Sequence, residues 1–158
     1  MAAMAGLEVG DKAPDFRVET DSEGEITRAS LKGRPYVVYF YPRDDTSGCT
    51  QEALDFTAAA RKFSDLGAFV LGVSKDSVAS HRKFRDKHKL KIALGSDTET
   101  KMAKDWGVWG EKTLYGRKYM GMERATFLVN AKGAIAGVWR KVKIRDHVVA
   151  VLAAAKAL

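Results

Sequence analysis

The chain has almost no cysteine: Cys49 is the only one among its 158 residues. A single cysteine excludes an intramolecular disulfide and any zinc site that is built from several cysteines. It also leaves Cys49 without a thiol partner in its own chain. Any disulfide that Cys49 forms must therefore join it to another molecule.

Long apolar runs are absent as well. No stretch is apolar over the roughly 20 residues that a membrane-spanning helix needs. Residues 1–8 lack the basic segment and following apolar run of a secretory signal. Hydrophobic residues make up 46% of the chain and charged residues 30%, an ordinary balance for a globular protein. We therefore expect a protein of the reducing cytoplasm with no membrane partner.

Acidic residues are fewer than basic ones: the chain has 27 Lys and Arg and 20 Asp and Glu, which gives a formal net charge of +7. The densest basic segment, Lys75 to Lys91, contains Phe84 as its only Phe, Tyr or Trp, and no nucleic-acid motif accompanies it. This segment is interpreted as a solvated helix face. The three histidines show no metal-ligand spacing with a third ligand. We predict no nucleic-acid partner, no metal and no other cofactor.

The apolar patterning that is present predicts strands and helices in alternation. The expected elements are a hairpin over 16–28, strands at 35–41, 68–73 and 92–94, helices at 48–66, 76–89 and 98–106, a hairpin of strands 125–129 and 134–139, and a last helix that Asp146 caps. This order predicts one domain over residues 1–158 of the α/β class, with a central mixed sheet flanked by helices and an N-terminal β-hairpin. Ligand chemistry in such sheets lies past the carboxyl ends of strands, where the loop from Pro42 to Cys49 falls.

Cys49 lies in the first turn of the predicted helix 48–66. The unpaired N–H groups and the positive dipole end of a helix stabilise an anion there, and the thiolate is the nucleophilic form of cysteine. The Thr46 hydroxyl, three residues earlier, can point at the sulfur or at a molecule bound beside it. Gly48 allows a substrate to approach the backbone closely, and Pro42 can cover the pocket.

Each of these residues also has a structural interpretation. Cys49 can be a small buried hydrophobe, as free cysteines often are. Thr46 can be only a helix N-cap, and Glu52 only an acid near the helix start. The combined pattern Pro-x-x-x-Thr-x-x-Cys-x-x-Glu after a buried strand is more specific than any of its members.

Residues 39–52 resemble the active-site segment of the peroxiredoxins, and the surrounding sequence is similar to the subfamily called bacterioferritin comigratory protein or peroxiredoxin Q. The resemblance spans nearly the whole chain, with further matching segments at 10–16, 74–78, 109–112 and 115–129. It implies a thioredoxin-like fold. It also implies a thiol peroxidase, an antioxidant enzyme that reduces hydrogen peroxide and organic hydroperoxides.

The resemblance also implies a role for each matching residue. Cys49 resembles the peroxidatic cysteine, Pro42 shields it, and Thr46 hydrogen-bonds the peroxide. Arg124 matches the arginine that stabilises the thiolate and polarises the peroxide, and Glu52 matches the acid that orients this network. From the residues alone, Arg124 can also be part of a surface salt bridge.

The chain departs from the subfamily pattern where a second cysteine is usual. Leu54 occupies the position of the resolving cysteine, five residues after Cys49, and the next helix, where others resolve, carries Ser80 and His81 instead. Ser47 replaces the usual proline. We therefore predict a one-cysteine peroxidase whose sulfenic acid is resolved by an external thiol such as thioredoxin, or glutaredoxin with glutathione.

Other interpretations remain open from the sequence. A disulfide between the Cys49 residues of two chains is less favoured, because sulfurs in pockets rarely approach closely enough. The resemblance implies a monomer. The alternative from another functional class is a non-enzymatic peroxide sensor or holdase chaperone that uses Cys49 as its switch.

Overall fold

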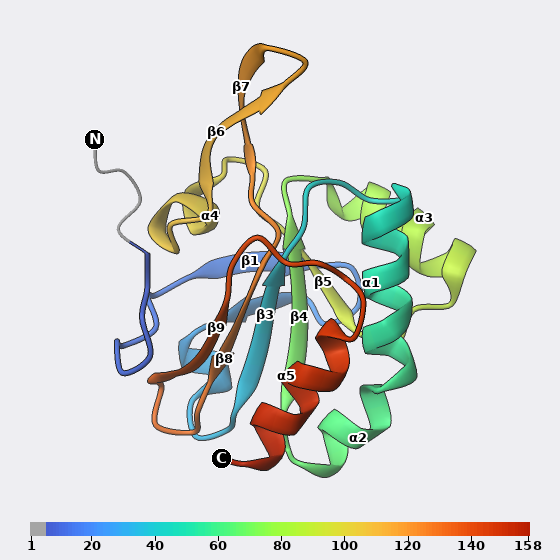
Figure 1. The fold of residues 1–158 in the computed structure, drawn as a ribbon. Helices are drawn as coiled ribbons and strands as arrows, with labels where there is room; N and C mark the ends of the chain where they lie inside the picture. Colours follow the sequence, from blue (N-terminus) through green and yellow to red (C-terminus); the bar gives the residue numbers. More distant parts are fainter. Residues whose placement is uncertain (1–5) are drawn as a thin grey trace.

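The computed structural model describes residues 6–158, and these form a seven-stranded mixed sheet with helices on both faces (Figure 1). Residues 1–5, part of the segment considered above for a secretory signal, lie outside the described residues. The sheet order is β2-β1-β5-β4-β3-β8-β9. The strands are β1 Arg17–Thr20, β2 Glu25–Thr27, β3 Tyr36–Phe40, β4 Phe69–Ser74, β5 Ala93–Ser96, β8 Ala125–Val129 and β9 Ile135–Trp139.

The centre of the sheet is parallel and its edges are antiparallel. β3 runs parallel to β4, and β4 to β5, whereas β8 pairs antiparallel with both β3 and β9. The helices are η1 Ala29–Leu31, α1 Ser47–Ala58, α2 Ala60–Asp65, α3 Val78–His88, α4 Lys101–Asp105 and α5 His147–Lys156. The predicted mixed α/β class and the N-terminal strand pair are confirmed.

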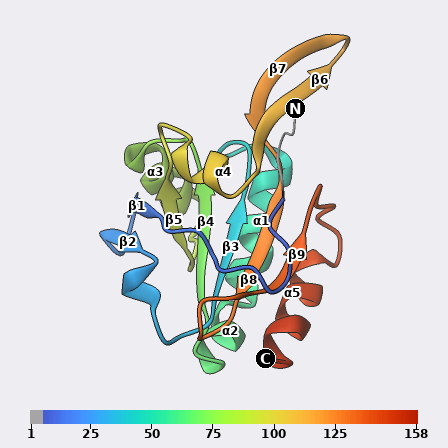
Figure 2. The ribbon, with the colours of Figure 1, turned by 90° about the vertical axis from the view of Figure 1, so that its left-hand side faces the viewer.

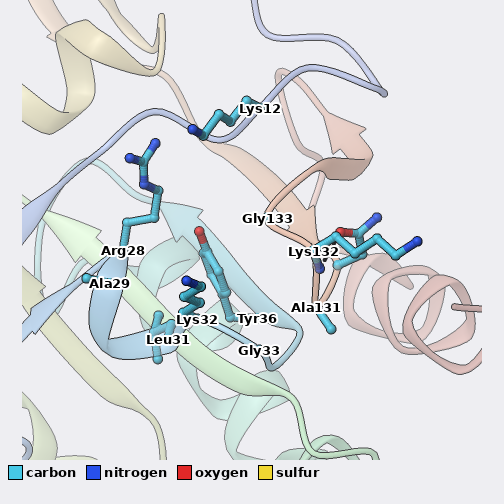
Figure 3. A pocket seen from close by; sticks show the side chains of 11 residues that line it. Lys12, Arg28, Ala29, Leu31, Lys32, Gly33, Tyr36, Ala131, Lys132 and Gly133 are labelled. Atoms are coloured by element: carbon cyan, nitrogen blue, oxygen red, sulfur yellow. Dashed lines mark hydrogen bonds between the residues drawn. The ribbon is translucent and has the colours of Figure 1, made fainter.

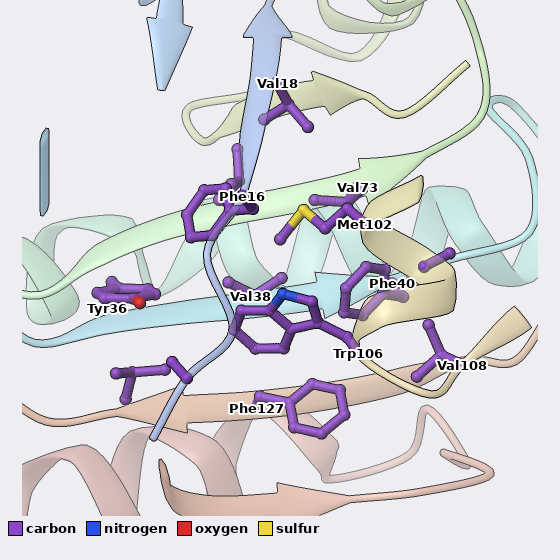
Figure 4. Close-up of a cluster of buried hydrophobic side chains, with 14 of the residues drawn as sticks. Phe16, Val18, Tyr36, Val38, Phe40, Val73, Met102, Trp106, Val108 and Phe127 are labelled. Atoms are coloured by element: carbon purple, nitrogen blue, oxygen red, sulfur yellow. The ribbon is translucent and has the colours of Figure 1, made fainter. Parts of the chain in front are cut away.

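Strand β3 supplies both halves of the core because its side chains alternate between the two faces of the sheet. Tyr36, Val38 and Phe40 point to the face covered by α4, where Trp106 packs edge-on against Phe127 with ring centroids 5.2 Å apart (Figure 4). Val37 and Tyr39, together with Tyr41 just after the strand, point to the face covered by α1, α2, α3 and α5. The second face is the one that carries Cys49.

Two expectations need correction. The single helix predicted over 48–66 is broken at Ala59, where φ is −95° and ψ is 1°, into α1 and α2. The break brings the rings of Phe56 and Phe63 to 6.0 Å, although seven residues of straight helix rise about 10 Å. The helix predicted at 98–106 is shorter, Lys101–Asp105.

The sequence patterns did not predict the hairpin of β6 Trp109–Leu114 and β7 Arg117–Met122, which forms a separate two-stranded sheet. Figure 2, turned by 90° from Figure 1, shows it projecting from the body of the molecule. None of the helices within residues 6–158 is long and apolar enough to cross a bilayer.

Candidate active site

Cys49 lies in the first turn of α1, just past the carboxyl end of β3. Its side chain belongs to the apolar cluster on that face of the sheet, and the residue is only 1% exposed. The backbone N–H groups of this first turn have no partner within the helix, and with the helix dipole they favour the negative charge of a thiolate. The predicted position of Cys49 at the start of a helix is confirmed.

Arg124, between β7 and β8, contacts the sulfur directly. Its Nη2 donates to Cys49 Sγ at 3.3 Å, and its Nη1 donates to Glu52 Oε1 at 2.7 Å. Glu52 follows Cys49 by three residues, so both side chains leave the same side of α1. Arg124 is thus not a surface salt bridge, because its guanidinium joins a buried carboxyl group and the buried sulfur.

Gly48 makes this contact sterically accessible. A Cβ atom at Gly48 would lie 3.2 Å from Arg124 Nη2 and 3.2 Å from Ile144 Cδ1, which is tighter than side chains normally pack. The backbone is therefore closely approached at Gly48, whereas the approach of a substrate to this backbone stays a prediction. The group that approaches it in this structure is the Arg124 guanidinium.

Burial is the main electrostatic influence on Glu52. It raises the pKa of this carboxyl group to about 7, although the Arg124 guanidinium acts in the opposite direction. Glu52 Oε2 is buried and has no hydrogen-bond partner among the described residues, whereas Oε1 is paired with Arg124. Near neutral pH, Glu52 therefore changes between a neutral and a charged partner of Arg124.

This titration predicts a pH dependence of stability that Glu52→Gln should remove. From the unfolded value near 4.5 up to about pH 7, the folded chain binds more protons at this position than the unfolded chain does. The stability that protonated Glu52 contributes is therefore fully present below pH 4.5 and is lost as pH rises through 7. In this range the free energy of unfolding falls by up to about 1.4 kcal/mol per pH unit. Urea unfolding at several pH values should show that the free energy of unfolding of Glu52→Gln increases relative to that of the wild type between pH 5 and 7.

The matched control for that experiment is Glu23→Gln, at an exposed position. Its unfolding free energy should follow the wild-type pH curve throughout. If the Glu52→Gln curve also ran parallel to the wild type, the titration assigned to Glu52 would be wrong.

The loop between β3 and α1 is fastened to α3 through Asp44. Asp44 accepts hydrogen bonds from the Tyr41 hydroxyl at 2.6 Å and the Ser80 hydroxyl at 2.8 Å, and its Oδ2 lies 2.7 Å from His81 Nδ1. His81 Nε2 must carry a proton because its partner, the Gly95 carbonyl 3.0 Å away, can only accept. The buried Asp44–His81 contact therefore joins the loop to α3.

Asp45 fastens the same loop at the surface. It has a left-handed backbone conformation (φ 61°), which aspartate tolerates better than most residues. Its carboxylate accepts from Lys87 at 2.7 Å and from His88 at 2.9 Å, and these hydrogen bonds lower the pKa of Asp45. Both aspartates thus use α3 to hold the segment that leads into Cys49.

Thr46 and Pro42 lie in this loop without an observed contact to the sulfur. Thr46 occupies the N-cap position of α1, but its hydroxyl donates to the Arg43 carbonyl at 3.0 Å and makes no capping bond. Pro42 is half-buried and comes two residues after β3 ends. The peroxide contact of Thr46 and the shielding by Pro42 stay predictions.

Two further groups lie beside the site. The Tyr39 ring stacks on Phe56 with centroids 4.5 Å apart, and its buried hydroxyl has no partner among the described residues. His147 Nε2 shares a hydrogen bond of 2.8 Å with the Thr126 hydroxyl. Burial, with Arg124 adding to the effect, lowers the pKa of His147 to about 4, so the ring is neutral near pH 7. His147 is the first residue of α5, and its neighbours Thr126 and Phe56 come from β8 and α1.

A separate cavity of about 450 Å³ lies at the other end of β3, around Tyr36 (Figure 3). Figure 3 shows Arg28 and Lys12 beyond the Tyr36 hydroxyl, while the Lys132 side chain extends away from the cavity. The hydroxyl oxygen is itself buried. This cavity is separated from Cys49 by the length of β3, and it contributes no group to the chemistry described above.

The fold and this site define a class: an α/β protein in which a helix-start cysteine and an arginine meet at the end of a central strand. Residues 9–138 match the AhpC/TSA family, and the chain belongs to that family. It is 44% identical over 142 residues to peroxiredoxin Bcp of Bacillus subtilis, covering 90% of both proteins. It is also 44% identical over 146 residues to a putative peroxiredoxin bcp of Coxiella burnetii, covering 92% of this chain and 97% of that protein.

Solved structures agree with this assignment. A structure of peroxiredoxin Q from Xanthomonas campestris superposes with a TM-score of 0.87, at 41% identity and 98% coverage of both chains. PrxQ from Xylella fastidiosa gives a TM-score of 0.90 at 34% identity, covering 97% of this chain and 98% of that one. The chain therefore has the thioredoxin-like fold of the peroxiredoxins.

Proposed function

We propose that this chain is a thiol-dependent peroxidase that reduces hydrogen peroxide and organic hydroperoxides through Cys49. The observation that carries the proposal is the contact of 3.3 Å between Arg124 Nη2 and Cys49 Sγ in the first turn of α1. A related structure, the bacterioferritin comigratory protein of Xanthomonas campestris, is described with alkyl peroxide reduction activity. The family assignment and the site chemistry support the same reaction.

In the first step, the Cys49 thiolate attacks one oxygen of the hydroperoxide and the O–O bond breaks. The sulfur becomes a sulfenic acid, and the other oxygen leaves as an alkoxide or hydroxide that takes a proton from water. Negative charge thus moves from sulfur to the departing oxygen. The Arg124 guanidinium presents several donors in a rigid fork, so it can serve the sulfur and the peroxide at the same time.

Three further residues assist this step by orienting Arg124, by binding the peroxide and by shielding the sulfur. Glu52 holds the Arg124 guanidinium through its bond of 2.7 Å. The Thr46 hydroxyl turns from the Arg43 carbonyl to the bound peroxide, adding a donor where charge develops. Pro42 covers the reacting sulfur against water. The match to the family pattern supports these roles of Thr46 and Pro42, and the bond between Glu52 and Arg124 supports that of Glu52.

In the second step, an external thiol attacks the sulfenic acid sulfur, forming a mixed disulfide and releasing water. A second thiol then reduces this disulfide and returns Cys49 to its starting state. Leu54, at the usual resolving position, is half-buried against the apolar cluster. The proposed reductants are thioredoxin, or glutaredoxin with glutathione. We propose that the chain works as a monomer.

A peroxidase assay with separate reductant systems tests this function. Wild-type protein should consume many equivalents of hydroperoxide with dithiothreitol, and the thioredoxin and glutaredoxin systems run separately identify the biological reductant. A peroxide sensor or holdase would consume about one equivalent per chain and then stop. The absence of steady turnover with every reductant would reject the enzyme in favour of that second class.

The lone cysteine also predicts over-oxidation. A sulfenic acid that waits for an external thiol remains exposed to further peroxide, so excess peroxide with limiting reductant should convert Cys49 to the sulfinic acid. Mass spectrometry of the intact chain would show two added oxygens. Non-reducing electrophoresis after one equivalent of peroxide should show no covalent dimer, and a quantitative dimer would contradict resolution by an external thiol.

A further inference from the structure

The hairpin of β6 and β7, here called the arm, leads directly into Arg124, which contacts the Cys49 sulfur. Its strands pair only with each other and not with the seven-stranded sheet. Figures 1 and 2 show it rising from the end of the sheet at which α1 begins. β7 ends at Met122, two residues before Arg124, whose guanidinium contacts the Cys49 sulfur.

The arm concentrates exposed apolar side chains. Eight large hydrophobic residues are exposed within residues 6–158, and four of them lie in the 14 residues of the arm: Leu114, Tyr115, Tyr119 and Met120. A cluster of exposed apolar groups on a soluble surface marks an interaction site. Tyrosine, methionine and arginine are also the residues that interfaces favour.

The two faces of the arm differ in charge. Directly opposed residues share a face, so Lys112 and Tyr119 lie on the same side as Leu114 and Arg117. We call this the basic face, because it carries two cations and no acid. The opposite face carries Glu111, Thr113, Lys118 and Met120, and there Lys118 lies 3.9 Å from Glu111.

The basic face is continuous with the site of Cys49. The side chains of Lys112 and Tyr119 lie over Gly121, since a Cβ there would be 2.8 Å from Lys112 Cδ and 3.1 Å from Tyr119 Cε2. Lys112 Nζ donates to the Met122 carbonyl at 2.7 Å, at the base of the arm. Arg117, at the other end of this face, has no acidic partner among the described residues.

The proposed reaction requires a partner at this place. Cys49 is 1% exposed and has no second cysteine in its chain, so the resolving thiol must come from another molecule. A molecule that reaches the sulfur beside Arg124 also meets the base of the arm, because β7 ends two residues before Arg124. A partner that lies against the basic face needs an apolar surface for Tyr119 and Leu114. It also needs acidic groups for Lys112 and Arg117.

We propose that the basic face of the arm docks a thiol protein whose surface around its reactive cysteine is acidic and apolar. This inference rests on the peroxidase function proposed above, because the docked protein is the reductant of the Cys49 sulfenic acid. The arm positions that protein, and the attack on sulfur occurs at the base of the arm.

Two double variants with equal charge change test the proposal. Leu114→Ser with Arg117→Glu alters the basic face, and Met120→Ser with Lys118→Glu alters the opposite face. Leu114 is 55% exposed and Met120 56%, so neither variant removes buried packing. Steady-state kinetics would be measured with reduced thioredoxin of net negative charge and, separately, with dithiothreitol. The oxidation of Cys49 by peroxide would be followed alone by tryptophan fluorescence.

The basic-face variant should raise KM for thioredoxin by about tenfold, the effect of losing one or two good contacts. The opposite-face variant should change KM less than twofold. Both should keep the wild-type rates with dithiothreitol and in the peroxide step, which also shows that they are folded.

Equal KM values for the two variants would overturn the docking proposal, as would a wild type that turns over with dithiothreitol but not with thioredoxin. Neither result would contradict the proposed peroxidase function. Failure of the wild type to consume peroxide with dithiothreitol would instead reject the proposed function.

Discussion

Replacing Cys49 by serine should reduce peroxide consumption to the uncatalysed background, a loss of at least about 10⁴-fold. A serine hydroxyl is almost fully protonated near neutral pH, whereas the thiol gives a thiolate that attacks the peroxide oxygen. The Arg124 guanidinium 3.3 Å away stabilises a sulfur anion and cannot by itself generate an alkoxide. The measurement is the steady-state rate with dithiothreitol, compared with a blank that contains no protein.

Serine is smaller than cysteine and fits within the buried space that the Cys49 side chain fills, so Cys49→Ser should keep the fold. Its thermal unfolding midpoint is the control. Peroxidase activity that survived in a folded Cys49→Ser protein would refute the mechanism as a whole, because Cys49 is the only cysteine of the chain.

Replacing Arg124 by glutamine should lower the second-order rate constant for Cys49 oxidation by about 10²–10³-fold, the usual effect of removing one donor from a developing anion. The variant loses the contact to sulfur and leaves Glu52 buried without its cation. The loss of Arg124 leaves the buried Glu52 carboxyl group without its hydrogen-bond partner, which is itself destabilising by about 1–3 kcal/mol. The rate must therefore be measured on folded protein, by stopped-flow tryptophan fluorescence.

Two further variants separate chemistry from stability. Arg124→Gln combined with Glu52→Gln removes the unpaired carboxyl group, so it should recover stability but not rate. Arg140→Gln breaks a second, more exposed arginine–glutamate pair, since Arg140 donates to Glu123 at 2.7 and 2.8 Å and has no hydrogen bond to Cys49. Its rate constant should stay within about twofold of the wild type. An equal loss in Arg124→Gln and Arg140→Gln would show that Arg124 acts only through the fold.

The local parts of the site were predictable from the sequence. Cys49 and Glu52 are one turn apart in α1, so helix periodicity alone places their side chains on one side. The buried strands and the connecting helices also followed from apolar patterning, because a strand buried on both faces, such as β3, must be continuously apolar.

The long-range parts were not predictable in this way. Arg124 is 75 residues from Cys49, and its contact depends on the register of β3 with β8, which pairs Phe40 with Ala125. That register brings the start of β8 beside the carboxyl end of β3, where the loop to α1 begins. The family resemblance implied the role of Arg124, but no local pattern specifies this pairing.

The arm and the Asp44–His81 pair illustrate two further reasons why parts of the structure could not be predicted from the sequence. The arm has an exposed apolar and basic surface without the alternation of a half-buried strand, so its sequence carries only a weak strand signal. Asp44 and His81 meet through a loop and a helix that are 37 residues apart, and polar side chains at such separations show no periodicity.

Composition alone determines that any thiol chemistry of this chain uses Cys49 and that Cys49 has no internal thiol partner, because a count of cysteines does not depend on the fold. The environment of that atom comes from folding. Sheet register supplies Arg124, burial raises the pKa of Glu52, and the bonds from α3 to Asp44 and Asp45 hold the loop. These contacts join residues that are distant along the chain, so they exist only once the strands and helices have packed.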